Sequence, residues 1–207
     1  MSKNKGLFIV FEGPDRSGKT TQINLLAEAL NKKRIKFLIT REPGGCPLSE
    51  KIRDLLLDPK NNISPMAELL LYEAARAQHT AEKILPALKR GEVVISDRFF
   101  LATLAYQGYG RKIDLSIVRK LNSVAALGLK PDLTFLFLMP DREFEKRDRK
   151  KDGLNPDRIE REKADFRKKV NSAYRKLALT EKNIISIDAT LKVEKINEFI
   201  LKKLKLK

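Results

Sequence analysis

Short, nearly continuous apolar runs alternate along the chain with longer segments in which apolar residues recur every three or four positions. The short runs are rich in β-branched and aromatic residues, which is typical of strands covered on both faces. We expect strands at residues 7–11, 36–40, 93–96, 133–138 and 184–187.

The segments between these runs predict helices. Ser49 and Ser64 are expected N-caps, and Pro65 suits the first helical position. Pro86 is expected to kink or end the long third helix, and Gly91 to stop it. The expected helices span residues 20–32, 49–57, 64–90, 114–127, 142–150, 157–179 and 193 to the end.

Strands that alternate with helices throughout predict an α/β fold with a mostly parallel sheet. In such sheets ligands bind at the carboxyl ends of the strands, so functional residues should gather there. We find no internal repeat, low-complexity segment or interdomain linker, and we therefore expect a single domain over residues 1–207.

The first predicted strand leads into the segment GPDRSGKTT at residues 13–21. Its spacing is that of a loop whose backbone N–H groups surround phosphates. Lys19 would place its charge on the β- and γ-phosphates, and Thr20 would offer a hydroxyl to Mg²⁺. The predicted nucleoside triphosphate site comprises Gly13, Pro14, Asp15, Arg16, Ser17, Gly18, Lys19, Thr20 and Thr21.

The loop alone does not separate a GTPase from an ATPase or a kinase. No Asn-Lys-x-Asp segment that could read guanine is found, since the segment NKKR at residues 31–34 lacks the aspartate. This disfavours a GTPase.

Composition and charge narrow the class of protein. The chain of 207 residues is 42% hydrophobic and 34% charged, which is typical of a globular protein with one core. Its net charge of +16 is compatible with nucleic-acid binding, with attraction of a phosphorylated small molecule, or with solvation alone. No basic segment is interleaved with aromatic residues, so nucleic acid is not expected as a specific partner.

We expect a cytoplasmic location, because no targeting signal is recognised and because of the cysteine usage. No apolar run approaches the ~20 residues that a membrane span needs, and no signal peptide is recognised at the N-terminus. Cys46 is the only cysteine, which fits a reducing compartment.

Several arginines are expected near the carboxyl edge of the sheet. Arg41 and Arg98 follow predicted strands, and Arg76 lies in the long helix. Such a cluster indicates a second anion, hence an acceptor that itself carries phosphate. Because a phosphate monoester is already nucleophilic near neutral pH, its second pKa being about 6, no general base is required. The single histidine, His79, has no evident partner and is expected to be structural or at the surface.

The segments FEGPDRSGKTTQ, TREPGG, LLYEAARAQ, DRFFLATLAYQGYGR and DRIE occur in this order, and together they resemble the thymidylate kinase family. The resemblance covers about residues 7–190. It implies a P-loop NTPase fold with a five-stranded parallel sheet flanked by helices on both faces, and a small mobile lid near residues 147–157. It also implies a homodimer that transfers the γ-phosphoryl group of ATP, with Mg²⁺, to dTMP.

The resemblance implies a role for each matched residue. For the acceptor, it implies that Asp15 binds the sugar 3′-hydroxyl, that Tyr72 stacks on thymine, and that Tyr106 lies under the sugar. The other acceptor residues are Arg76, Thr103 and Gln107 at the base, with Arg98 and Arg41 at the phosphate. On the donor side, Arg147 resembles an adenine neighbour, while Thr20 and Asp97 are the expected metal residues.

The expected catalytic residues are Arg16, Lys19 and Arg98. Members of the family carry the catalytic arginine either in the phosphate loop or in the lid, and this chain has Arg16 in the loop as well as Arg147 and Arg149 in the basic lid. We favour Arg16. Alternatives that stay open are a monophosphate kinase of other base specificity, a kinase of unphosphorylated nucleosides, and a basic nucleic-acid-binding protein with a vestigial loop.

Overall fold

A computed structural model describes residues 6–149 and 156–206 of the chain. The side chains of Asp148 and Arg149 are outside that description. Most of the segment expected as a lid, residues 150–155, is outside it too, so the lid stays a prediction.

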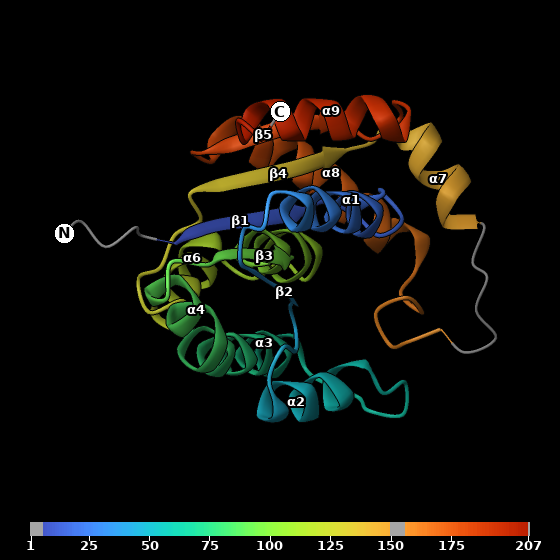
Figure 1. Ribbon diagram of the computed structural model, residues 1–207. Coiled ribbons are helices and arrows are strands. Elements are labelled where there is room, and N and C mark those ends of the chain that lie inside the picture. The colour runs from blue at the N-terminus through green and yellow to red at the C-terminus, as the bar shows by residue number, and fades with distance from the viewer. Residues whose placement is uncertain (1–5, 150–155, 207) are drawn as a thin grey trace.

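A five-stranded parallel sheet in the order β2-β3-β1-β4-β5 forms the centre of the molecule (Figure 1). The strands are β1 (Leu7–Glu12), β2 (Phe37–Arg41), β3 (Val93–Asp97), β4 (Leu133–Leu138) and β5 (Ile184–Asp188). Each begins and ends within one residue of the expected strand. Arg41, Asp97 and Phe11 stand level in the register, so the carboxyl ends of β1, β2 and β3 meet at one edge.

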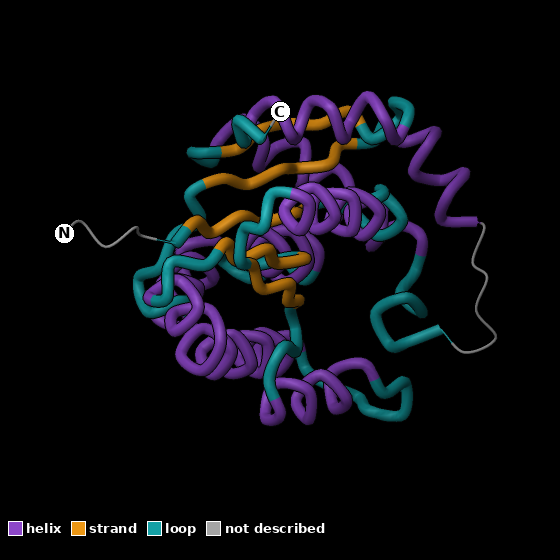
Figure 2. The backbone as a smooth tube through the Cα atoms, viewed as in Figure 1, coloured by secondary structure: helices purple, strands orange, loops and turns teal. Residues whose placement is uncertain are grey.

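Helices cover both faces of the sheet (Figure 2). They are α1 (Lys19–Lys32), α2 (Pro47–Leu57), α3 (Pro65–His79), α4 (Leu85–Lys89), α5 (Phe100–Thr103), α6 (Leu115–Ala125), α7 (Asp141–Arg149), α8 (Ala164–Thr180) and α9 (Val193–Lys203), with two π-helical segments, η1 (Thr80–Ile84) and η2 (Leu104–Gly110).

Alternating residues of β1 belong to two different cores. Ile9 and Phe11 pack in the cluster that holds α1 and α9, whereas Phe8 and Val10 pack on the opposite face with α4 and the start of α5. Since successive strand side chains point to opposite faces, a continuous apolar run fits a strand covered on both sides. The α/β fold class is confirmed.

The long third helix is continuous but irregular. Pro86 does not end it: the π-helical turn η1 comes before, and α4 continues to Lys89. A proline removes an N–H donor, and a π-type turn lets the neighbouring backbone groups find other partners. Gly91, with φ 81°, then stops the helix as expected.

Two predicted helix starts are wrong. Helix α2 begins at Pro47 with Cys46 as N-cap, and Ser49 is instead buried, where it donates a hydrogen bond to the Ala75 carbonyl. Helix α8 begins only at Ala164, because residues 157–163 form a turn whose amides are bound by Asp157. Local propensity does not show that a serine faces another helix, nor that an aspartate closes a turn.

Elements α5 and η2, after β3, were not expected from the sequence. Their segment contains Gly108 and Gly110, which disfavour helix. These elements carry Thr103, Tyr106 and Gln107, so their existence decides where those side chains point.

Candidate active site

The loop between β1 and α1 has the backbone that a phosphate site requires. Gly13 has φ 135°, and a Cβ there would lie 2.6 Å from the Phe137 carbonyl oxygen. Gly18, with φ 94°, stands at the N-cap of α1, so the positive end of that helix faces the loop. The hydroxyl of Ser17 is buried and has no hydrogen-bond partner among the described residues. The donors of this loop therefore fit an anion.

Lys19 lies across this loop. Its Nζ donates to the carbonyl oxygens of Gly13 and Pro14, at 3.2 Å and 3.0 Å. Burial, and then the charge of Arg98, lower the pKa of Lys19 to about 8. A polyphosphate beside this amine would raise its pKa again, since an opposite charge favours the ionised form.

Thr20 and Asp97 meet at the mouth of the loop. The Thr20 hydroxyl donates to Oδ2 of Asp97 at 3.4 Å, which joins the start of α1 to the end of β3. No group of three or more His, Cys, Asp or Glu side chains suited to a metal exists in residues 6–149 and 156–206. A hydroxyl and one carboxylate fit Mg²⁺, which commonly takes one or two protein oxygens and completes its shell with phosphates and water.

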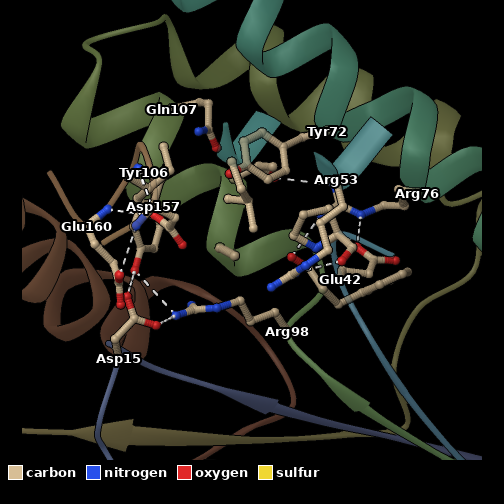
Figure 3. Close-up of a pocket in the computed structure, with 16 residues that line it drawn as sticks. Asp15, Glu42, Arg53, Tyr72, Arg76, Arg98, Tyr106, Gln107, Asp157 and Glu160 are labelled. Atoms are coloured by element: carbon tan, nitrogen blue, oxygen red, sulfur yellow. Dashed lines mark hydrogen bonds and ion pairs between the residues drawn. The ribbon is translucent and has the colours of Figure 1, made fainter. Parts of the chain in front are cut away.

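Beside the loop is a cavity of about 260 Å³ (Figure 3). It lies between α3, η2, the loop after β1, the end of β3 and the turn at residues 157–160. The polar and aromatic side chains around it are Asp15, Glu42, Arg53, Tyr72, Arg76, Arg98, Phe99, Thr103, Tyr106, Gln107, Asp157 and Glu160. Such a mixture of a flat aromatic surface and convergent charges suits a nucleotide.

Arg98 joins the loop to the cavity. Its Nη1 donates to the Gly13 carbonyl at 3.0 Å and to the Tyr174 hydroxyl at 2.8 Å, and its Nη2 donates to Asp15 at 2.5 Å. The Arg98 backbone has φ 74°, a strained conformation for a residue other than glycine. Strain of this kind is commonly retained at functional positions.

Asp15 accepts hydrogen bonds from Arg98 and, at 3.2 Å, from the Tyr106 hydroxyl. Desolvation opposes ionisation of Asp15, but Arg98 and Lys19 outweigh it and hold the pKa at about 2. Solvent reaches 57% of this side chain, so the desolvation counts for less than in a closed core. Asp15 is therefore an ionised acceptor that faces the cavity.

Arg76 forms the floor of the cavity and is only 2% exposed. Its Nε donates to Glu42 at 2.7 Å, its Nη1 to Glu73 at 2.8 Å and to Asn122, and its Nη2 to the Phe99 carbonyl at 2.9 Å. These bonds hold the guanidinium rigidly.

His79 is buried under this floor. Its ring nitrogens contact Thr40 at 2.6 Å and Glu42 at 3.1 Å. The prediction of a structural histidine is confirmed, while the alternative of a surface residue and the apparent lack of a partner are wrong. Its partners come from the end of β2 and the residue just after it, and only the fold brings these next to α3.

Tyr72, Thr103 and Gln107 also line the cavity, and Figure 3 shows Tyr72 and Gln107 on the side away from Asp15. Gln107 lies across from Tyr72 in Figure 3, and its amide nitrogen donates to Glu68 at 2.8 Å. The Thr103 hydroxyl lies 3.0 Å from the Phe100 carbonyl oxygen and 2.8 Å from Oδ1 of Asn122, and either oxygen can accept its single proton.

The structure changes which arginine reaches the cavity from the region after β2. Arg41 is 54% exposed, pairs with Glu50 at 2.9 Å and is not among the residues that line the cavity. Arg53, from α2, does line it and is steadied by a bond to the Pro43 carbonyl at 2.9 Å. Arg41 is the last residue of β2, a strand at the edge of the sheet, and its side chain is exposed there. Arg53 reaches the cavity because it lies on the face of α2 that is turned toward it.

Sequence reasoning missed Arg53, Glu42, Asp157 and Glu160 as cavity residues. Glu42 lies within TREPGG, and Asp157 and Glu160 lie within DRIE. Three of the four residues therefore belong to segments that already resembled the family. The signal for Arg53 was weaker, since it is one basic residue within an amphipathic helix.

Arg16 and Arg147 bind each other's backbone. Nη1 of Arg16 donates to the Arg147 carbonyl at 3.4 Å, and Nη1 of Arg147 donates to the Arg16 carbonyl at 3.2 Å. Nη2 of Arg147 donates to the Ala189 carbonyl at 3.0 Å. Arg147 thus bridges the phosphate loop and the segment after β5.

Within the described part of the chain, every helix is too short or too polar to cross a bilayer.

Comparison with known proteins identifies relatives along nearly the whole chain. The family model described as thymidylate kinase matches residues 11–200. The thymidylate kinase of Pelobacter propionicus is 48% identical over 202 residues, covering 95% of this chain and 92% of its relative. That of Halothermothrix orenii is 45% identical and covers 97% of each chain. The crystal structure of the thymidylate kinase from Ehrlichia chaffeensis superposes with a TM-score of 0.77 at 32% identity, over 97% of this chain and 98% of that one.

Proposed function

The chain belongs to the thymidylate kinase family, and from this we propose that ATP binds at residues 13–21 while dTMP binds in the adjoining cavity. The chain is a nucleoside monophosphate kinase that phosphorylates dTMP. The observation that carries the assignment of the two sites is the position of Arg98 and Asp15, which touch each other where the loop meets the cavity.

On the donor side, we assign the triphosphate to Lys19, to the buried Ser17 hydroxyl and to the amides of the loop. Thr20 and Asp97 would hold Mg²⁺, which supplies charge neutralisation and orientation of the phosphates when bound. Arg147 contacts the segment after β5, which supports a place for it beside adenine.

On the acceptor side, we assign the phosphate of dTMP to Arg98 and Arg53 rather than to the exposed Arg41. Asp15 would accept from the sugar 3′-hydroxyl, and Tyr106, bonded to Asp15, would lie under the sugar. The remaining assignments are Tyr72 as the stacking surface for thymine, with Arg76, Thr103 and Gln107 around the edge of the base.

The chemistry needs positioning and charge, not a base. The acceptor phosphate is already ionised near neutral pH, its second pKa being about 6, so its oxygen can attack directly. We assign stabilisation of the transferring group to Arg16, with Lys19 and Arg98 beside it. This fits the site, since the one histidine of the chain lies beneath the floor and is bonded to Thr40 and Glu42.

Further assignments are proposals. The lid near residues 147–157 and the homodimer rest on the resemblance to the family, whereas the single kinase domain and the cytoplasmic location rest on the sequence pattern and the cysteine usage. Sedimentation of the pure protein would test the dimer. The single cysteine, Cys46, is buried and unpaired, which supports a reducing compartment.

The deciding experiment is a coupled assay of ADP release with ATP, Mg²⁺ and each nucleoside monophosphate in turn. We expect fastest turnover with dTMP, slower turnover with dUMP, and much slower turnover with dCMP and dAMP. Turnover of AMP or GMP without dTMP would overturn the base assignment and keep the kinase class. Turnover of thymidine in place of dTMP would overturn the proposal that the acceptor carries a phosphate group. Tight, salt-dependent DNA or RNA binding without ADP release would favour the alternative of a basic nucleic-acid-binding protein with a vestigial loop.

A further inference from the structure

Glu68 is a fully buried carboxylate behind the wall of the cavity, and it is not one of the residues that line it. It lies on α3, one helical turn before Tyr72. A charge in such a place must have partners, because removing it from water is costly. The partners of Glu68 therefore show what this carboxylate does in the fold.

Glu68 binds three side chains from different elements. Its Oε1 accepts from Nε2 of Gln107 at 2.8 Å and from Nε of Arg111 at 3.0 Å. Its Oε2 accepts from Nη2 of Arg111 at 2.9 Å and from Nη1 of Arg158 at 2.6 Å. Burial alone would raise the pKa of Glu68, but the hydrogen bonds from Arg111 and Gln107 outweigh it and lower the pKa. The carboxylate is therefore ionised at neutral pH.

An ionised carboxylate only accepts hydrogen bonds, so the group of Gln107 that faces it must be the NH₂. The other half of that amide, the carbonyl oxygen, is left on the side of the cavity, where Gln107 faces Tyr72 (Figure 3). An isolated glutamine could flip its amide at little cost. Here Glu68 fixes which end is presented.

We propose that Glu68 is a positioning residue that sets the base preference of this cavity. By holding the nitrogen of Gln107, it presents a hydrogen-bond acceptor to the base and so favours a pyrimidine with N–H at ring position 3 over one with a bare nitrogen there. The proposal rests on the assignment of the cavity to the acceptor nucleotide. Thymine carries this N–H, whereas a cytosine offers a second acceptor that would oppose the Gln107 oxygen.

Replacing Glu68 with glutamine should reverse the presented group. Two arginines face Oε2, so the new carbonyl oxygen would turn toward them and the new NH₂ toward Gln107. Gln107 would then flip, accept from that NH₂, and present its own NH₂ to the base. The shape of the site would be kept. The polarity of the contact with Gln107 would be reversed, and the hydrogen bond from Nε of Arg111 would be lost.

The test compares dTMP with 5-methyl-dCMP, which keeps the methyl group and differs at ring positions 3 and 4. We expect Glu68→Gln to lower the ratio of kcat/KM for dTMP to that for 5-methyl-dCMP by about 10-fold or more. In a Gln107→Leu background the same substitution should leave the ratio unchanged, since its effect runs through that amide.

The matched control is Glu162→Gln. Glu162 also pairs with Arg111, at 2.5 Å, and among the described residues the hydrogen bond to the Gln107 amide comes from Glu68 and not from Glu162. This control should leave the ratio unchanged. Equal losses for both nucleotides in Glu68→Gln, with the ratio within about twofold of the unmutated protein, would mean that Glu68 only supports the fold. Failure of the proposed function is distinct, since the unmutated protein would then not prefer dTMP.

A second measurement does not need the Glu68→Gln variant to fold. In the unmutated protein, the side-chain NH₂ of Gln107, assigned by its loss in Gln107→Leu, should exchange slowly with solvent in nuclear magnetic resonance spectra before any nucleotide is added. Its chemical shift should move little when dTMP binds. Rapid exchange, or a large shift typical of a new donor to the ligand, would overturn the proposed orientation.

Discussion

Nη2 of Arg98 lies 2.5 Å from the carboxylate of Asp15, which joins the residue after β3 to the loop after β1. The two side chains come from segments 83 positions apart, and they meet because β1 and β3 are neighbours in the sheet. Each is positioned by the other. The contact also marks the boundary between the two proposed nucleotide sites, so variants of these residues should separate acceptor binding from donor binding.

Replacing Asp15 with alanine should weaken dTMP binding far more than ATP binding. A hydrogen bond to a charged acceptor contributes about 1.5–3 kcal/mol, which corresponds to a rise in the KM for dTMP of about 10- to 100-fold. Initial-rate kinetics at saturating ATP, together with calorimetry of ATP binding, measure both quantities. Loss of ATP affinity with the dTMP KM unchanged would contradict the assignment.

Arg53 and Arg41 form a matched pair of arginines near the end of β2. Arg53→Ala should raise the KM for dTMP by about 10-fold or more, because a charged contact to phosphate is lost. Arg41→Ala should change it little, since Arg41 makes an exposed pair with Glu50 and such pairs contribute at most about 1 kcal/mol. The reverse pattern would restore Arg41 to the phosphate site.

Arg16 and Arg147 are the two described candidates for the arginine that stabilises the transferring phosphoryl group. We expect Arg16→Gly to lower kcat by about 100-fold or more while the KM for dTMP changes little, since the charge is needed mainly in the transition state. Arg147→Ala should chiefly raise the KM for ATP. Single-turnover rates distinguish the two outcomes, and a collapse of kcat only in Arg147→Ala would transfer the role to that arginine.

Tyr72 is assigned to stacking on the base. Tyr72→Phe keeps the ring and should leave the KM for dTMP nearly unchanged, whereas Tyr72→Ala removes a contact of about 1–3 kcal/mol and should raise the KM by about 10- to 100-fold. Thermal unfolding of both variants is the control, because Tyr72 lies on a core helix. An equal effect of the two substitutions would mean that the hydroxyl, not the ring, makes the contact.

Glu12 should make the stability of the protein fall with rising pH. Its side chain is fully buried behind the site, and burial raises its pKa to about 7 against the opposing effects of Arg98 and the Phe99 amide. Between pH 4.5, its ordinary pKa, and about 7 the folded chain keeps a proton that the unfolded chain has released. The contribution of Glu12 to the free energy of unfolding is therefore largest below this window and decreases within it by up to about 1.4 kcal/mol per pH unit.

Urea unfolding at intervals from pH 4 to pH 8 would measure this slope, with Glu12→Gln as the control. The variant cannot titrate at this position, so the difference between the two proteins should diminish across the window. A difference that is constant with pH would show that Glu12 has an ordinary pKa in the fold.

The local pattern of residues was sufficient for the sheet and for the phosphate loop. Every strand was placed within one residue because continuous β-branched and aromatic runs fit strands with two covered faces. Two helix starts, those of α2 and α8, do not follow from the local pattern. Ser49 has the chemistry of an N-cap, but its hydroxyl binds the Ala75 carbonyl on a neighbouring helix, and no local pattern carries that information.

Local sequence patterns were sufficient to predict the α/β fold and the strand–loop–helix that we propose binds phosphate, because backbone geometry imposes their periods and spacings on neighbouring residues. Three relationships became visible only in the folded chain: Arg53 and not Arg41 reaches the cavity, His79 is buried beside Glu42, and Glu68 holds Gln107. The physical reason is that these contacts join elements distant in the chain. Strand order and helix packing set the direction of each side chain, and they therefore decide which distant side chains meet.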